Sequence, residues 1–216
     1  MRAIASAPSS DWAFFGASID EVREHFTESS LCELTLAPKA PPPPTSPPVA
    51  PAHPSPPPSP PSPPAPPPTP PPCVAELELV FVLDKSGSVR SAQSALLAFA
   101  RDRVSEFSVD SNGGAQIGIV EFSSDAATLT PLTGSLNAVW AAIDSASPAG
   151  GGTSVSDGLA LGLSVITGPA ARADVPRTIL LLTDGIQTVD GNDNTAIAQA
   201  AVVKAAGVSI MAVGFG

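Results

Sequence analysis

Basic residues are scarce in this chain of 216 residues, which has ten Lys and Arg against twenty Asp and Glu and a net charge of −10. Proteins that hold nucleic acid by its phosphates carry clustered basic side chains, as do proteins that bind anionic membrane surfaces. The few, dispersed bases of this chain argue against both kinds of partner. An acidic balance instead favours divalent cations as partners.

Long apolar runs are also missing. Runs such as Ile179 to Leu182 are far short of the roughly 20 residues that a transmembrane helix needs, so we expect no membrane insertion. The start of the chain, from Met1 to Ala7, faintly resembles a signal peptide, but it lacks the apolar segment of about 7–15 residues. Either the chain is not secreted by that route, or Met1 is not its native start.

There are only two cysteines, Cys32 and Cys73, too few to define a disulfide framework. They flank a tract, residues 38–72, that holds 22 of the 27 prolines. Fully extended at ~3.1 Å per residue, this tract would reach about 110 Å, but its stiffness persists over only several residues. A Cys32–Cys73 bridge therefore stays open but is disfavoured, and we expect each cysteine to pair elsewhere or to stay free.

The tract itself consists almost entirely of Pro, Ser, Ala and Thr. Because proline has no N–H and a fixed φ, we predict a disordered, solvated polyproline II linker. Ser-Pro-Pro units at Ser55, Ser59 and Ser62 resemble the hydroxyproline-rich glycoprotein stalks of plant and algal cell walls, a resemblance that implies hydroxylated and glycosylated prolines. A plain spacer and a ligand for proline-reading domains are the alternative interpretations.

Residues 1–37 form an N-terminal segment of their own. Five apolar residues recur there at intervals of three or four, which predicts an amphipathic helix over residues 11–28: Trp12, Phe15, Ile19, Val22 and Phe26. The segment is either the end of a domain whose beginning is missing or a leader with an accidental pattern, and both interpretations stay open.

Residues 73–216 are the only part long enough to bury a sizeable core. Apolar runs predict strands at residues 77–83, 116–122, 128–132, 178–183 and 208–213, and the first of them is typical of a strand buried on both faces. Helical spacing of apolar residues lies between the strands, at residues 89–99, 136–143, 155–166 and 193–204. This alternation predicts an α/β fold, with a Rossmann-like, mostly parallel sheet flanked by helices.

Polar side chains follow the predicted strands. Asp84, Ser86 and Ser88 come after the first strand, Thr153 precedes the helix at residue 155, and Asp184 ends the strand at 178–183. Ligands of open parallel sheets bind beyond the carboxyl ends of the strands, so we expect these residues on one rim. Hydroxyl and carboxylate oxygens without Cys or His suit Mg²⁺, Mn²⁺ or Ca²⁺ rather than zinc. With so few carboxylates, such a site can accept a further one from a partner.

Some of these residues also have a purely structural explanation, and Asp184-Gly185 could be only a turn. Ser88, and either Thr153 or Ser154, are suited to cap helices. Asp157 lies in the first turn of its helix, where a carboxylate interacts favourably with the helix dipole. It is also a candidate for contact with a metal-bound water. Ser123, Ser124 and Asp125 end a strand on the same rim, where we interpret Asp125 as a solvated turn residue.

Taken together, three motifs resemble the metal-ion-dependent adhesion site (MIDAS) of von Willebrand factor type A domains: Asp84-x-Ser86-x-Ser88, Gly-Gly-Thr153 and Leu-Leu-Thr-Asp184-Gly. The resemblance extends over about residues 76–216. It implies direct metal coordination by Ser86 and Ser88, coordination by Thr153 in the ligand-bound form, and contacts of Asp84 and Asp184 largely through water. It also implies a protein ligand whose acidic residue completes the coordination of the metal.

The family normally continues with a sixth strand and further helices, whereas this chain stops after the strand at 208–213. We therefore expect a C-terminally truncated domain with an unpaired sheet edge, in a native chain that continues beyond Gly216. Cys73 resembles the flanking cysteine of extracellular family members, whose usual partner would lie beyond residue 216.

These observations predict a divalent-metal-dependent adhesion module on a proline-rich stalk, located outside the cell or in a cell wall, with a protein or glycan partner. The alternatives are a structural cell-wall glycoprotein and a non-catalytic subunit of an ATPase- or chelatase-type complex. We do not expect an enzyme, because the sequence offers neither a nucleophile–base pair nor a phosphate-binding loop.

Overall fold

The computed structural model describes residues 13–16, 18 and 72–215. Its strands are β1 (Ala13–Gly16), β2 (Leu77–Asp84), β3 (Ala115–Phe122), β4 (Ala126–Thr133), β5 (Arg177–Thr183) and β6 (Ser209–Phe215). Its helices are the 3₁₀ turn η1 (Ser88–Ser91) and the α-helices α3 (Gln93–Val104), α4 (Leu136–Asp144), α5 (Val155–Ile166) and α6 (Asp193–Ala205). Every strand and helix expected from residue 77 onward is thus present, with bounds that differ by a few residues.

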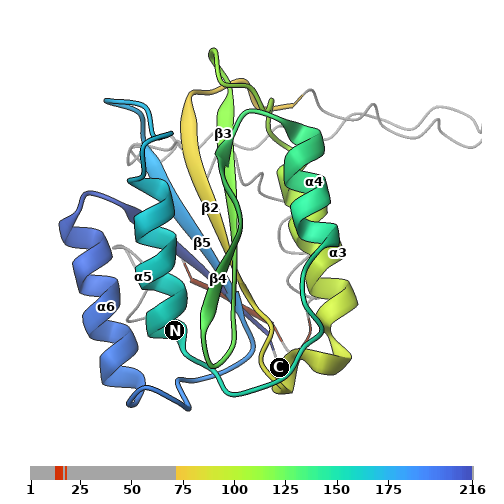
Figure 1. Ribbon diagram of the computed structural model, residues 1–216, viewed down its shortest axis with the longest axis vertical. Helices are drawn as coiled ribbons and strands as arrows, with labels where there is room; N and C mark the ends of the chain where they lie inside the picture. The colour runs from red at the N-terminus through yellow and green to blue at the C-terminus, as the bar shows by residue number, and fades with distance from the viewer. Residues whose placement is uncertain (1–12, 17, 19–71, 216) are drawn as a thin grey trace, which may run out of the picture.

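The strands form one sheet in the order β1-β6-β5-β2-β3-β4. All neighbouring strands pair in parallel except β3 and β4, which are antiparallel. Helices α3 and α4 cover one face of the sheet, and α5 and α6 cover the other (Figure 1). The predicted Rossmann-like, mostly parallel α/β architecture is therefore confirmed.

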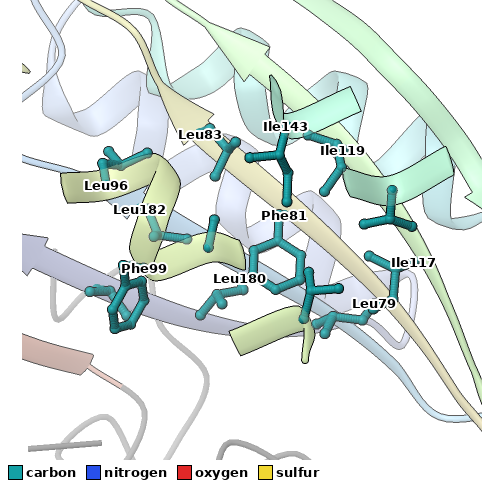
Figure 2. Close-up of a cluster of buried hydrophobic side chains, with 14 of the residues drawn as sticks. Leu79, Phe81, Leu83, Leu96, Phe99, Ile117, Ile119, Ile143, Leu180 and Leu182 are labelled. Carbon is teal, nitrogen blue, oxygen red and sulfur yellow. The ribbon is translucent and has the colours of Figure 1, made fainter. Parts of the chain in front are cut away.

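The two faces of β2 hold separate cores, because alternate side chains of a strand point to opposite sides. Leu79, Phe81 and Leu83 face α3 and α4, and Figure 2 shows Phe81 in the middle of this cluster. Val80 and Val82 face α5 and α6. All eight residues of β2 are buried, as expected for a central strand of a sheet with two covered faces.

Two glycines let α5 lie close against the sheet. A Cβ on Gly158 would lie 2.9 Å from ring atoms of Phe122, and a Cβ on Gly162 would lie 2.9 Å from a methyl group of Val82. Real Cβ atoms do not come this close, so a larger side chain at either position would push the helix outward. The close packing fixes the start of α5, and with it the loop that carries Thr153.

Two expectations about the sheet edge were wrong. Residues 13–16, which the spacing of apolar residues assigned to a helix, form the strand β1 instead. This strand pairs in parallel with β6, with Phe14 opposite Val213, so the β6 edge is not unpaired. The edge of β6 offers backbone N–H and C=O groups to a neighbouring strand, and pairing with them outweighed the helical spacing of the apolar residues.

Other expectations fall on residues that the structure does not describe. These are the rest of the predicted helix over residues 11–28, apart from Ser18, and the linker up to residue 71. Cys73 is disulfide-bonded, so the alternative that it stays free is wrong, and its partner lies outside the described residues. Within residues 13–16, 18 and 72–215, none of the helices has the length and hydropathy that a membrane crossing requires.

Candidate metal site

The predicted site residues meet at the carboxyl ends of β2 and β5, which are neighbours in the sheet. Asp84 is the last residue of β2, and Asp184 directly follows the end of β5. The chain leaves β2 for β3 on one side, and β5 lies on the other, so this is the switch point where α/β sheets bind their ligands. The prediction of a common rim for these loops is confirmed.

Asp84 is a buried carboxylate held from both sides. One oxygen, Oδ1, accepts a hydrogen bond from the Ser86 N–H at 2.7 Å, and Oδ2 accepts one from the Thr183 hydroxyl at 2.5 Å. Its side chain is almost inaccessible, with the residue 1% exposed. The ion pairs in the described part of the chain leave it without a basic partner.

Burial raises the pKa of the Asp84 carboxyl above its usual value, and the nearby charge of Asp184 adds to this shift. The hydrogen bonds from Thr183 and Ser86 act in the opposite direction. A buried carboxylate that lacks a basic partner is costly to ionise. A cation bound beside Asp84 would remove this cost.

The two serines and Asp184 form a chain of short contacts. The Ser86 and Ser88 hydroxyl oxygens lie 3.0 Å apart, and the Ser88 hydroxyl donates to Asp184 Oδ1 at 2.9 Å. Ser88 does not cap a helix, because Gly87 is the N-cap of η1 and no side chain caps it. The structural explanation of Ser88 as a helix cap is therefore wrong.

Thr153 reaches the site from the loop before α5. It is 4% exposed, and Ser154, not Thr153, caps α5 by accepting from the Asp157 N–H. A Cβ on Gly185 would lie 3.6 Å from Thr153 Oγ1 and 3.9 Å from the Ser88 hydroxyl. The Thr153 and Ser88 hydroxyls therefore flank the same glycine, on the side of the site that Asp184 borders.

Backbone contacts join the loop before α5 to the loop after β2. The Gly150 N–H donates to the Lys85 carbonyl at 2.7 Å, and the Gly87 N–H donates to the Gly151 carbonyl at 3.0 Å. Gly151 has a φ of +85°, a left-handed conformation that favours glycine. The glycine run before Thr153 thus places that residue by close backbone approach.

Lys85 strengthens this connection. Its ammonium group pairs with Glu121 Oε1 at 3.2 Å. The Glu121 carboxylate also accepts hydrogen bonds from the N–H and the hydroxyl of Ser147, both at 2.8 Å. Since Ser147 belongs to the same loop as Thr153, Lys85 ties both loops to β3.

The donor set fits a small divalent cation. Neighbouring ligands of an octahedral ion with bonds of about 2.0–2.1 Å lie about 3 Å apart, and the two serine oxygens are separated by 3.0 Å. The donors are hydroxyls with two carboxylates, and among the described residues no three His, Cys, Asp or Glu side chains form a metal-binding group. If the neutral hydroxyls bind the ion directly and the two carboxylates act through water, as the resemblance implies, the ion keeps a positive coordination sphere that can attract a carboxylate from outside.

Other candidate residues lie around this centre. Asp157 is half-buried in the first turn of α5, as expected. Ser124 accepts from the Gly152 N–H at 2.9 Å and so supports the glycine run. Asp125 is exposed, in agreement with its interpretation as a turn residue.

Two threonines that matter to the site had no predicted role. Thr183 holds the carboxylate of Asp84, and Thr188 accepts from the Thr153 N–H at 2.8 Å. Thr183 directly precedes Asp184, a proximity that could have drawn attention to it. Thr188 carries no comparable signal, because its contact depends on the path of the loop after β5.

Comparisons with known proteins agree with this geometry. The family model of the von Willebrand factor type A domain matches residues 78–216. None of the curated protein sequences matches the chain. Among solved structures, proximal thread matrix protein 1 from the mussel byssus is 25% identical with a TM-score of 0.57, over 66% of this chain and 36% of that protein. The chain thus spans about a third of that protein, whose structure has a zinc-occupied MIDAS motif.

Two further structures have the same fold at lower identity. Manganese-loaded TRAP protein from Plasmodium vivax is 17% identical with a TM-score of 0.58, over 67% of this chain and 59% of that one. The pilus adhesin SpaC from Lactobacillus rhamnosus GG is 18% identical with a TM-score of 0.53, over 64% and 24%. The zinc in the mussel protein means that the argument against zinc from donor type does not hold for such sites in general.

Proposed function

The chain belongs to the von Willebrand factor type A domain family, and we propose that residues 73–216 act as a divalent-metal-dependent binding module. The observation that carries this proposal is the cluster formed by the Ser86 and Ser88 hydroxyls and Asp184 beside Asp84, a buried carboxylate that has no basic partner among the described residues. Family relatives contain divalent metal, zinc in one case and manganese in another. We expect Mg²⁺, Mn²⁺ or Ca²⁺ here.

Each site residue has a distinct task in this proposal. The Ser86 and Ser88 hydroxyls bind the ion, and Thr153 joins them from the facing loop. Asp84 and Asp184 act largely through water, and Thr183 keeps the Asp84 carboxylate oriented. A bound ion supplies a positively charged position that attracts an acidic side chain of a partner.

We further propose that the partner is a protein or glycan outside the cell or in a cell wall. The support is the likeness to a matrix protein of the mussel byssus, at 25% identity. The acidic balance of the chain is consistent with a cation that bridges two acidic surfaces. The proline-rich tract would then hold the module away from its attachment point.

We also propose that the module is not an enzyme. The hydroxyls of the site contact one another and carboxylates, which is typical of ligand positioning rather than of an activated nucleophile. The two histidines of the sequence, His25 and His53, lie outside the described residues.

Binding of a small carboxylate probe tests this function. The full chain, labelled with ¹⁵N, is titrated with acetyl-aspartyl amide and acetyl-glutamyl amide in the presence of Mg²⁺, with acetyl-asparaginyl amide as the control. We expect amide shifts at residues 84–88, 153 and 184–185 with the two acids, and their loss in EDTA. Equal shifts with the asparaginyl probe, or shifts that survive EDTA, would contradict the proposal.

A further inference from the structure

A small pocket, about 70 Å³ in volume, lies beside the metal site, and its lining combines apolar residues with the polar residues Gln187 and Asp193. Its walls come from the loop after β5 and from the first turns of α5 and α6, which lie side by side on one face of the sheet (Figure 1). Val155 and Ala196 line it from the two helices, and Gly185 and Ile186 line it from the loop. The space suits the tip of one side chain.

The pocket collects apolar surface that the fold does not bury. Four large apolar side chains are exposed in the described part of the chain, and two of them, Ile186 at 67% and Ile197 at 38%, line this pocket. The other two are Val74 and Val202. Scattered exposed residues need no explanation, but two around one pocket next to a binding site indicate a contact surface.

The loop that carries Ile186 is held in place by hydrogen bonds to α5 and α6. Gln187 is 6% exposed, and its side-chain amide exchanges two hydrogen bonds with Ser156 of α5, at 2.7 and 3.1 Å. The Gln187 N–H also donates to Asp193 Oδ1 at 3.1 Å. With Gln187 pinned between the two helices, the neighbouring Ile186 is presented to solvent by a fixed backbone.

Gly185 connects the pocket to the metal site. It lines the pocket, and its missing Cβ would lie 3.6 Å from Thr153 Oγ1. A ligand residue at the metal and its neighbour in the pocket would therefore lie on two sides of one glycine. The acidic residues Asp184 and Asp193 border this region, which disfavours a second acid in the ligand.

We propose that the pocket binds an aliphatic side chain of the partner, directly next to the carboxylate that completes the metal site. The partner motif is thus one acidic residue with an adjacent leucine-, isoleucine- or valine-sized residue. This inference rests on the proposed metal-dependent binding and specifies its ligand.

The test compares four dipeptide probes on the full chain in Mg²⁺. Acetylated Leu-Asp and Asp-Leu amides are matched with Ala-Asp and Asp-Ala amides, and dissociation constants are measured by ¹⁵N–¹H NMR titration. Partial burial of the larger side chain predicts about five- to tenfold tighter binding for at least one leucine probe over its alanine counterpart. Amide shifts at residues 185–187 and 197 should accompany this preference.

Two variants separate the pocket from the metal. Ile186→Ser combined with Ile197→Ser should abolish the leucine preference, while Mn²⁺ affinity and binding of the alanine probes stay unchanged. Val202→Ser, a change at an exposed valine of α6 that does not line the pocket, should leave the preference intact. A melting curve for each variant verifies folding, which these exposed positions should not disturb.

The outcomes distinguish the two proposals. If all four probes bind with equal affinity in a metal-dependent manner, the pocket inference is overturned and the metal-dependent function stands. A leucine preference that survives the double isoleucine change overturns the inference as well. If no probe binds in a metal-dependent manner, the proposed function fails, and the pocket inference fails with it.

Discussion

The charge of Asp84 favours metal binding but lowers the stability of the metal-free fold. Its carboxyl is buried, and burial raises its pKa. A carboxyl whose pKa is raised by folding stabilises the protein below its unfolded pKa, and this contribution is lost as the pH rises through the folded value. The ionised form of Asp84 therefore destabilises the metal-free fold, and a bound cation relieves this cost.

The variant Asp84→Asn removes that charge and nearly preserves the shape. We expect the metal-free variant to melt a few degrees higher than the metal-free wild type. A gain of about 1 kcal/mol in the free energy of unfolding gives a shift of this size for such a domain. We also expect Mn²⁺ affinity to fall by about 10–100-fold, the usual effect of losing a residue that orients metal ligands. Scanning calorimetry with and without Mn²⁺ measures both effects. A lower melting temperature for the metal-free variant would contradict the account of Asp84.

The clustering of the five candidate residues at one rim was predictable because each follows a strand or precedes a helix whose own pattern is clear. Asp84 and Asp184 follow two of the most apolar runs in the chain, and parallel strands bring such ends together. The supporting hydrogen bonds were not predictable. Glu121 and Ser147 are 26 residues apart in sequence, and Thr153 and Thr188 are 35 apart, so only the folded chain reveals their contacts.

At the scale of elements, the position of α5 against the sheet depends on two glycines that have no side chain. Gly158 and Gly162 lie against Phe122 and Val82, where the sheet leaves no room for a Cβ. Glycine inside a helix costs about 1 kcal/mol relative to alanine. The close approach to the sheet offsets that cost and sets the position of Ser154, the cap next to Thr153.

The substitution Gly158→Ala therefore has two opposite effects on the free energy of unfolding. The gain in helix propensity is about 1 kcal/mol, whereas overpacking against Phe122 and Val82 costs typically 1–3 kcal/mol. We expect a net loss of up to about 2 kcal/mol, together with weaker Mn²⁺ binding because the start of α5 shifts. Urea unfolding measures the stability. Ser164→Ala, at an exposed position of the same helix, should be neutral or slightly stabilising, and an equal stability gain at Gly158 would contradict this account.

The strand β1 marks the limit of local patterns. Trp12, Phe15 and Ile19 have helical spacing, yet residues 13–16 extend along β6. The spacing of apolar residues indicates which side chains would share one face of a helix. Pairing with an open sheet edge can override this local preference. The strands β2, β3, β5 and β6 were predictable because their burial makes them largely apolar, whereas the edge strand β4 is mostly not buried.

Truncation tests the role of β1. A chain that lacks residues 1–16 loses the partner of β6, whereas a chain that lacks residues 1–12 keeps it, and both retain the two cysteines. We expect the shorter chain to melt several degrees lower and to associate as its concentration rises, because the β6 edge becomes free to pair with another copy. Analytical ultracentrifugation and calorimetry measure this. Identical behaviour of the two truncations would contradict the pairing of β1 with β6.

At the scale of the whole molecule, the fold gathers its polar chemistry at one edge of the sheet. Both faces are covered by helices and filled with apolar side chains. The carboxyl ends of β2 and β5 carry the buried carboxylate, the hydroxyl cluster and the small pocket beside it. The stability of the domain thus comes from its core, and the loops at this edge are free to serve binding.

Titration of the full chain with Mn²⁺ by calorimetry tests the central claim most directly, with Ser86→Ala/Ser88→Ala compared with the wild type. Ser91→Ala/Ser94→Ala, at exposed serines of η1 and α3, is the matched control. We predict one Mn²⁺ site in the wild type and in the control, and at least a 100-fold loss of affinity in the Ser86/Ser88 variant with an unchanged melting temperature of the metal-free protein. Mn²⁺ binding by the Ser86/Ser88 variant with wild-type affinity would contradict the assignment of the metal site.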